Sequence, residues 1–151
     1  MAKPTTEFLL RDLLTAVYWF DEGLQSHLEA AGWPRQSRTK SMMMINLANG
    51  LTRPIQLAAR LGISRQAVQL ALADLEKEGL IRLEPDPDDK RAKRAVYTDD
   101  PRGKQMQKAA LEALHSIEAE LEKRLGARAY AQFSRALRSD WGPPLVPGSD
   151  S

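Results

Sequence analysis

Residues 61–81 (LGISRQAVQLALADLEKEGLI) combine a regular apolar pattern with polar side chains at its start. If the residues from Arg65 onward form a helix, successive side chains turn by about 100° around its axis. Apolar side chains then gather on one side, and these are Val68, Ala71, Leu72 and Leu75. The opposite side carries Arg65, Gln66, Gln69 and Ala73. The pattern predicts a helix with one buried face and one hydrogen-bonding face.

The hydrogen-bonding face has the chemistry that reads base edges in a DNA major groove. An arginine can donate two hydrogen bonds to guanine, a glutamine can pair with adenine, and an alanine offers a methyl group. Ser64 can cap the first turn, and a helix N-terminus with a serine hydroxyl favours a phosphate. We therefore predict that DNA is contacted by Ser64, Arg65, Gln66, Gln69 and Ala73.

The segment before this helix supports the prediction. TRPIQLAARLG (residues 52–62) has Pro54 where a first helical turn tolerates it and Gly62 as a stop signal. A turn of Gly62, Ile63 and Ser64 then joins two short helices, which is the spacing of a helix-turn-helix. Packed helices that touch no DNA can show the same spacing, so the pair alone leaves that alternative open.

Two alternating stretches, LIRLEP and RAVYT, follow the helix and predict a β-hairpin with a highly charged loop. The acidic residues come first: Glu84, Asp86, Asp88 and Asp89. The basic residues come next: Lys90, Arg91, Lys93 and Arg94. We expect the acids, in particular Asp88 and Asp89, to hold the loop in shape and leave one or two arginines for a minor groove or phosphates. A solvated turn would carry the same run of charges.

Catalytic chemistry has few candidate residues in this chain. It has two histidines, His27 and His115, and no cysteine, and it lacks a glycine-rich phosphate loop. No cluster of carboxylates has a spacing that would bring the groups together. We predict no enzymatic activity, no catalytic residue, no metal and no cofactor.

Composition leaves the location of any basic patch to local sequence. The formal net charge is +2 and the sequence pI is about 9.0, so a nucleic-acid surface has to be local. The absence of cysteine fits a reducing compartment. No apolar run reaches the roughly 18 residues of a membrane span, and the N-terminus mixes acidic residues into its apolar stretch. We expect a soluble, cytoplasmic protein without a membrane partner.

The remaining segments predict long helices around this region. Apolar residues at helical spacing run from Thr6 to about Ala31, and KSMMMINLAN (40–49) forms a second helix that Ser37 or Thr39 can cap. Pro101 opens a helix that Gly126 ends, and a last helix covers about 127–139. The expected fold class is mainly α with a small β-hairpin wing, built as a winged helix-turn-helix lobe plus long helices.

Three motifs together resemble the MarR family of winged-helix regulators: GISRQAV, LEKEGLI and DPDDKRA at this spacing. The resemblance is close from Ile55 to Lys104. Two features depart from the family pattern. Lys90 precedes Arg91 where the family usually has Asp-x-Arg-Arg, and VYTDDPRG replaces the usual LT-x-x-G, which suggests an extra residue before the long helix.

The resemblance implies a homodimer that binds double-stranded DNA and regulates, for example represses, transcription of nearby genes. It divides the chain into an N-terminal dimerisation helix (6–36), a winged helix-turn-helix region (37–100), C-terminal dimerisation helices (101–140) and a flexible tail (141–151). It also places a pocket for a small aromatic or apolar effector near the junction of dimer helices and DNA lobe. The candidate lining residues there are Tyr18, Trp19, His27 and Trp33.

Two alternatives stay open at this level. Ordinary core packing also explains the aromatic residues of the candidate effector pocket. Winged helices also serve as protein-protein adaptors that bind no specific DNA sequence, and such an adaptor would use an apolar outer face. The predicted outer face of residues 65–73 is polar apart from Leu70 and Ala73, which favours DNA.

Overall fold

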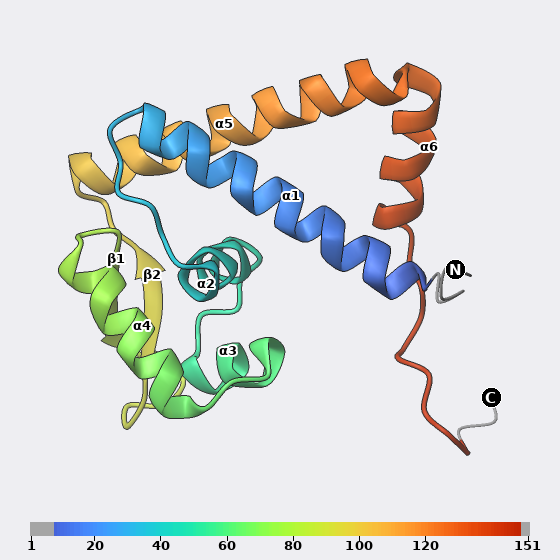
Figure 1. Ribbon diagram of the computed structural model, residues 1–151. Helices are drawn as coiled ribbons and strands as arrows, with labels where there is room; N and C mark the ends of the chain where they lie inside the picture. Colours follow the sequence, from blue (N-terminus) through green and yellow to red (C-terminus); the bar gives the residue numbers. More distant parts are fainter. Residues whose placement is uncertain (1–7, 149–151) are drawn as a thin grey trace, which may run out of the picture. The chain divides into compact units, whose positions relative to one another are not determined.

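The helices and strands follow the predicted order in the computed structural model, which describes residues 8–148 (Figure 1). The elements are α1 (Leu9–Ala30), α2 (Arg38–Ala48), α3 (Pro54–Leu61), α4 (Arg65–Lys77), β1 (Ile81–Pro85), β2 (Lys93–Tyr97), α5 (Pro101–Leu125) and α6 (Ala127–Arg138). The predicted fold class, mainly helical with a two-stranded hairpin, is confirmed. The predicted first residue of α1, Thr6, lies outside the described residues.

Two compact units divide the chain, one ending at His115 and the other beginning at Ser116. The first unit contains α1 to α4, the hairpin and the N-terminal part of α5. The second contains the rest of α5 and α6. Among the helices of residues 8–148, none has both the length and the apolar content needed to span a membrane.

Serine and glycine set the ends of the short helices. Ser37 caps α2 by accepting a hydrogen bond from the Lys40 amide at 3.3 Å, so α2 begins two residues earlier than the sequence predicted. Ser64 caps α4 in the same way, accepting from the Ala67 amide at 3.0 Å. Gly62 ends α3 with φ of 65°, a left-handed conformation that costs glycine little. The helix-turn-helix geometry therefore depends on one glycine and one serine.

The core of the first unit lies where the C-terminal part of α1, α2, α3, α4 and the hairpin meet. Its most buried large side chains are Leu28, Met43, Leu57, Val68, Leu72, Leu75 and Ile81. All four residues predicted for the buried face of α4 are buried, so the helical periodicity in the sequence identified this face correctly. Met43, in the middle of the SMMMI segment, is fully buried, as expected of a flexible side chain that fills a core.

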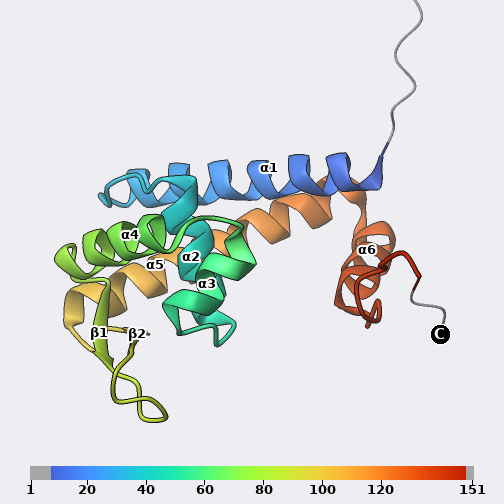
Figure 2. The ribbon, with the colours of Figure 1, turned by 90° about the horizontal axis from the view of Figure 1, so that it is seen from below.

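The hairpin is antiparallel, with Ile81 opposite Tyr97 and Glu84 opposite Arg94. The Ala95 amide also donates to the carbonyl oxygen of Thr52 at 2.8 Å, which joins β2 to the segment before α3. Figure 2 shows the hairpin loop projecting beyond α3 and α4. The base of the wing is thus hydrogen-bonded to the segment before α3, and its tip projects from the lobe.

In the second unit, Gly126, whose φ is 85°, separates α5 from α6, and the chain turns sharply there (Figure 1). Tyr130 on α6 donates from its hydroxyl to Glu118 on α5 at 3.4 Å. No residue of α6 is buried, although Tyr130, Phe133 and Leu137 recur on one side of this helix. The apolar side of α6 therefore has little to cover it within this unit.

Close packing explains Gly103, which stands in the first turn of α5. A Cβ atom placed on Gly103 would lie 2.0 Å from Cγ2 of Thr98 and 3.1 Å from the carbonyl oxygen of Gly79. Thr98 is held in place because its Oγ1 accepts a hydrogen bond from the Asp100 amide at 3.1 Å. The threonine and glycine of the TDDPRG motif are thus the two sides of one contact between the wing and α5.

Replacing Gly103 with alanine should destabilise the protein by about 1 to 3 kcal/mol, because the new methyl group overlaps the Thr98 side chain. Higher helix propensity of alanine offsets at most about 1 kcal/mol. The free energy of unfolding from urea denaturation measures the change. The double variant Thr98→Ser, Gly103→Ala removes the overlapping methyl group and should recover part of the loss; no recovery would contradict this explanation.

Candidate nucleic-acid interface

The outer face of α4 presents the side chains predicted to read DNA. Arg65, Gln66, Gln69 and Ala73 are exposed, on the side opposite the four buried apolar residues. Within residues 8–148, none of the three polar side chains has a hydrogen bond or ion pair to another residue. Ser64 is exposed as well, but its hydroxyl oxygen is engaged as the helix cap. The face is therefore a set of available donors and acceptors.

Arg53, which the sequence analysis did not single out, holds the base of the wing. Its Nε donates to Oδ2 of Asp86 at 2.6 Å and its Nη2 donates to Oδ1 of Asp86 at 3.2 Å. The same Nη2 donates to Asp88 at 2.9 Å. Asp86 is only 2% exposed, and a buried carboxylate needs such a partner. The predicted role of Asp88 in stabilising the wing thus involves a cation from before α3, rather than a lysine or arginine of the wing.

The ion pair lowers the pKa of Asp86 and raises the pKa of Arg53. Hydrogen bonds from Arg53, and then from the Asp88 amide, hold the pKa of Asp86 below its usual range, while burial opposes them. The pKa of Arg53 is raised, mainly by its hydrogen bond to Asp86. Both groups are therefore charged across the physiological pH range. We call this ion pair between Arg53 and Asp86 the wing clasp.

A second ion pair crosses the hairpin, between Glu84 on β1 and Arg94 on β2, with nitrogen and oxygen 2.6 Å apart. Arg82 also donates to Glu84, at 3.1 Å. These two arginines lower the pKa of Glu84, Arg94 having the larger effect. The structure therefore places Arg94, predicted as a DNA contact, in a cross-strand pair and away from the loop tip.

The tip of the wing keeps three exposed cations, Lys90, Arg91 and Lys93. In the part of the chain that the structure describes, none of the three forms an ion pair. Asp89 shapes the tip by accepting a hydrogen bond from the Arg91 amide at 3.0 Å. Glu84, Asp86 and Asp88 are thus paired with arginines, and three cations against the one carboxylate of Asp89 leave the tip with a net positive charge.

A groove of about 880 Å³ separates the start of α4 from the wing. Arg65 and Gln69 line it from α4, Arg91 and Lys93 from the wing, and Arg53 and Ile55 from the start of α3. The groove brings together donors that can contact base edges and cations that can contact phosphates. Among residues 8–148, no group of three histidine, cysteine, aspartate or glutamate side chains is arranged to hold a metal.

Comparison with known proteins matches this region to the MarR family model over residues 38–92. This part of the chain is therefore similar to the MarR family. The match covers the helix-turn-helix and the first strand and tip of the wing. No curated protein sequence matches the chain.

Several solved structures share the fold of this chain at about 20% sequence identity. The apo form of MarR from E. coli has a TM-score of 0.65 and 20% identity, with 87% of this chain and 96% of that chain covered. Transcriptional regulator Tm0710 from Thermotoga maritima has a TM-score of 0.59 and 21% identity, over 85% and 87% of the two chains. A mutant of MepR from S. aureus, bound to an oligodeoxyribonucleotide, has a TM-score of 0.55 and 19% identity, with 87% of this chain and 94% of that chain covered.

The four residues predicted for an effector pocket lie apart from the apolar cavity of the first unit. Tyr18 lies beneath the Arg38 guanidinium at 4.1 Å, and Trp19 packs edge-on against Phe20. His27 forms a hydrogen bond with the Gly23 carbonyl, and Trp33 lies 5.3 Å from the Arg102 guanidinium. None of the four lines the apolar cavity described next.

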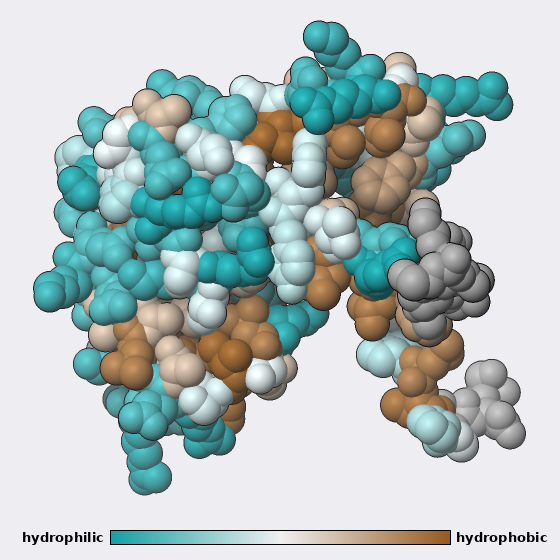
Figure 3. Space-filling view, viewed as in Figure 1, coloured by the Kyte–Doolittle hydropathy of each residue, from teal (hydrophilic) through white to brown (hydrophobic). Residues whose placement is uncertain are grey.

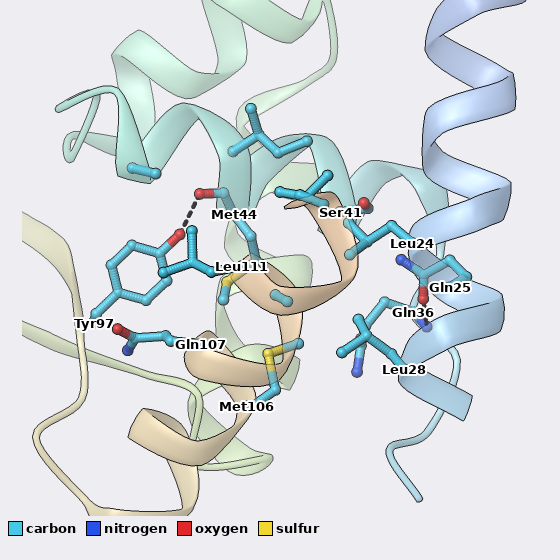
Figure 4. Close-up of a pocket in the computed structure, with 14 residues that line it drawn as sticks. Leu24, Gln25, Leu28, Gln36, Ser41, Met44, Tyr97, Met106, Gln107 and Leu111 are labelled. Carbon is cyan, nitrogen blue, oxygen red and sulfur yellow. Dashed lines mark hydrogen bonds between the residues drawn. The ribbon is translucent and has the colours of Figure 1, made fainter. Parts of the chain in front are cut away.

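An apolar cavity of about 200 Å³ lies among α1, α2, the end of β2 and α5 (Figure 4). Leu24, Leu28, Met44, Met106, Leu111 and Leu114 supply most of its apolar wall. Its polar lining residues are all neutral: Gln25, Gln36, Ser41, Tyr97 and Gln107. The Tyr97 hydroxyl donates to the Met44 carbonyl, and burial raises the pKa of Tyr97 to about 12. Sequence reasoning looked for aromatic residues and missed this cavity, because its wall comes from side chains distant along the chain.

Removing the wing clasp should produce a stability loss that depends on pH. Asp86 has a lowered pKa in the folded protein, so its pair with Arg53 stabilises the fold above the unfolded-state pKa of about 3.9. This stabilisation is lost as pH falls through the folded-state pKa. The difference in free energy of unfolding between the wild type and Arg53→Met should therefore be largest near neutral pH and shrink below about pH 4.

Urea denaturation between about pH 3 and pH 7 measures this difference. Arg60→Met is the matched control, since Arg60 is an exposed arginine of α3, the helix that follows Arg53, and has no ion pair among the described residues. A stability difference for Arg53→Met that stays constant over the whole pH range would contradict the clasp.

Proposed function

We propose that this protein is a sequence-specific, double-stranded DNA-binding transcriptional regulator that acts as a homodimer on a pseudo-palindromic operator. The observation that carries the proposal is the groove between α4 and the wing. It joins unengaged base-reading side chains, Arg65 and Gln69, to the unpaired cations Arg91 and Lys93. The MepR mutant structure contains an oligodeoxyribonucleotide bound to a chain of the same fold, which supports DNA as the ligand.

The two sides of the groove have different tasks in this proposal. The face with Arg65, Gln66, Gln69 and Ala73 enters the major groove and reads base edges, while Ser64 and the helix N-terminus approach a phosphate. Lys90, Arg91 and Lys93 at the wing tip contact the phosphates or the neighbouring minor groove. Asp88 and Asp89 stabilise the shape of the wing by accepting hydrogen bonds from Arg53 and from the Arg91 amide, respectively.

Exposed apolar surface supports dimerisation through the terminal helices, 6–36 and 101–140. In the first unit, Phe8, which precedes α1, and the N-terminal half of α1 expose apolar side chains: Phe8, Leu9, Leu10, Leu14 and Val17. In the second unit, α6 has no buried residue and exposes Leu137, and Trp141 follows it in the tail. Apolar surface on this scale favours a second copy of the chain as its cover. Two recognition helices roughly 34 Å apart then define a site of about 16 to 20 base pairs.

The cavity among α1, α2 and α5 supports control by a small effector. Its lining includes no charged side chain, so it favours a neutral, mainly apolar or aromatic molecule. Gln107 is the polar group available to such a molecule, because its side chain has no hydrogen bond within the described residues. An effector that binds one arrangement of the lobe more tightly shifts the protein toward that arrangement.

Selection from a random duplex library by the purified protein, at about 150 mM salt, tests DNA binding and dimerisation together. We expect an enriched palindrome and a steep fall in affinity as salt rises. Enrichment of a single, non-repeated half-site would overturn the dimer, and no enrichment would overturn sequence-specific binding.

Replacing Arg65 with alanine should weaken binding to the selected site by about 1 to 3 kcal/mol and relax the base preference at one position in each half-site. Affinities for single-base variants of the site measure both effects. Arg35→Ala is the control, since Arg35 pairs with Glu22 and Glu29 and lies outside the groove. Unchanged base preference would remove Arg65 from the readout.

Replacing Arg91 with alanine should weaken binding to all sequences alike and lower the slope of log affinity against log salt by about one phosphate contact. Arg94→Ala is the matched comparison, because Arg94 pairs with Glu84 and should affect the wing's stability more than the salt slope. Salt titrations of both variants measure this slope. An equal decrease of the slope in Arg91→Ala and Arg94→Ala would show that Arg94 contacts the DNA too.

A protein-protein adaptor is the second candidate function, and exposed apolar residues of the lobe favour it. Ile55 on α3 and Leu70 on α4 are 54% and 63% exposed. Figure 3 shows apolar surface over α3 and the adjoining part of α4 on one face of the lobe. An apolar complex would keep its affinity as salt rises, whereas a DNA complex loses affinity through counterion release. The same salt titration therefore separates the two functions.

A further inference from the structure

Gln36 is a buried polar residue that contacts both the apolar cavity and the recognition helix. It lies in the connection between α1 and α2, is 7% exposed and lines the cavity. Its side-chain amide donates to Oε2 of Glu78, the residue that ends α4, at 2.7 Å. A second, smaller pocket is lined by Gln36, Glu78 and Met106 together. One side chain thus bridges the cavity wall and the end of α4.

The position of Gln36 is held from the α1 side as well. Its backbone amide donates to Oε1 of Gln25 at 2.8 Å, and Gln25 also lines the cavity (Figure 4). Asp21, one turn earlier on α1, accepts from Ser41 at 2.5 Å and from Arg38 at 3.0 Å. In a buried network whose members are all engaged, displacing one group disturbs the next.

Glu78 has a second donor that does not touch the cavity. Lys40 on α2 donates from Nζ to Oε1 of Glu78 at 2.7 Å, and it also lies 3.7 Å from Asp74 on α4. The end of α4 is therefore held by two bonds of comparable length. Only the bond from Gln36 begins at the cavity wall.

We propose that Gln36 is a positioning residue that transmits occupancy of the apolar cavity to the recognition helix. A molecule in the cavity presses on Gln25 and Gln36, displaces the Gln36–Glu78 hydrogen bond and tilts α4. The distance along the helix from Glu78 to Arg65 is about 20 Å, so a tilt of about 5° moves the base-reading end by about 2 Å. The expected effect on DNA binding rests on the proposed function, whereas the expected movement of α4 on occupancy of the cavity does not.

The test uses a built-in occupant of the cavity, because the natural ligand is unidentified. Ala110→Phe in the full-length chain adds a phenyl ring to a residue of the cavity wall on α5. The readouts are amide hydrogen exchange of residues 65–78, which needs no DNA, and affinity for the selected operator. Each is measured for Ala110→Phe in the wild type, in Gln36→Met and in Lys40→Met.

We expect Ala110→Phe to raise exchange at the end of α4, and to lower operator affinity, by about fivefold or more in the wild type and in Lys40→Met. In Gln36→Met both effects should fall below about twofold, since the connection from the cavity is missing. Lys40→Met is the matched control, because it also removes one bond to Glu78 but leaves the cavity wall intact.

Three outcomes overturn the inference: no response of α4 to Ala110→Phe, an equal response with and without Gln36, or loss of the response in Lys40→Met as well. If circular dichroism shows that Ala110→Phe does not fold, Leu24→Phe, next to Gln25 in the same wall, takes its place. A response of α4 without any DNA binding by the wild type would support the connection and overturn the proposed function. The two failures are thus distinguishable.

Discussion

The ion pair between Arg53 and the buried carboxylate of Asp86 is the constraint on which the candidate interface depends. A carboxylate that is 2% exposed is costly without a partner, so the base of the wing has to stay beside the residue that precedes α3. The bond from Ala95 to Thr52 adds a backbone link at the same point. Together they orient the loop tip toward the start of α4, and the groove between wing and helix follows from this arrangement.

Ion pairs also determine which charges of the wing remain exposed. Acidic residues close to DNA would repel phosphates, yet Glu84, Asp86 and Asp88 all lie against arginines. Because those pairs are internal, the exposed charge at the tip comes mainly from Lys90, Arg91 and Lys93. A small overall net charge of +2 is therefore compatible with a strongly cationic contact surface.

Helix α4 is held by different kinds of contact at its two ends. At its start a serine cap and a glycine turn leave Arg65 and Gln66 exposed. At its end Glu78 is bound to Gln36 and Lys40, and through Gln36 it borders the apolar cavity. The buried side chains between these ends make α4 a rigid body, so a displacement at one end is felt at the other.

Local rules in the sequence were sufficient for the order of the elements, the serine and glycine helix ends, and the buried and exposed faces of α4. Those features depend on periodicity and on residues a few positions apart, which one sequence contains in full. Tertiary structure alone decided that Asp86 pairs with Arg53, that Arg94 pairs across the hairpin, and that neutral side chains from α1, α2 and α5 line the cavity. Such contacts join residues 10 to more than 30 positions apart, because packing selects among many partners of similar chemistry that the sequence leaves equally available.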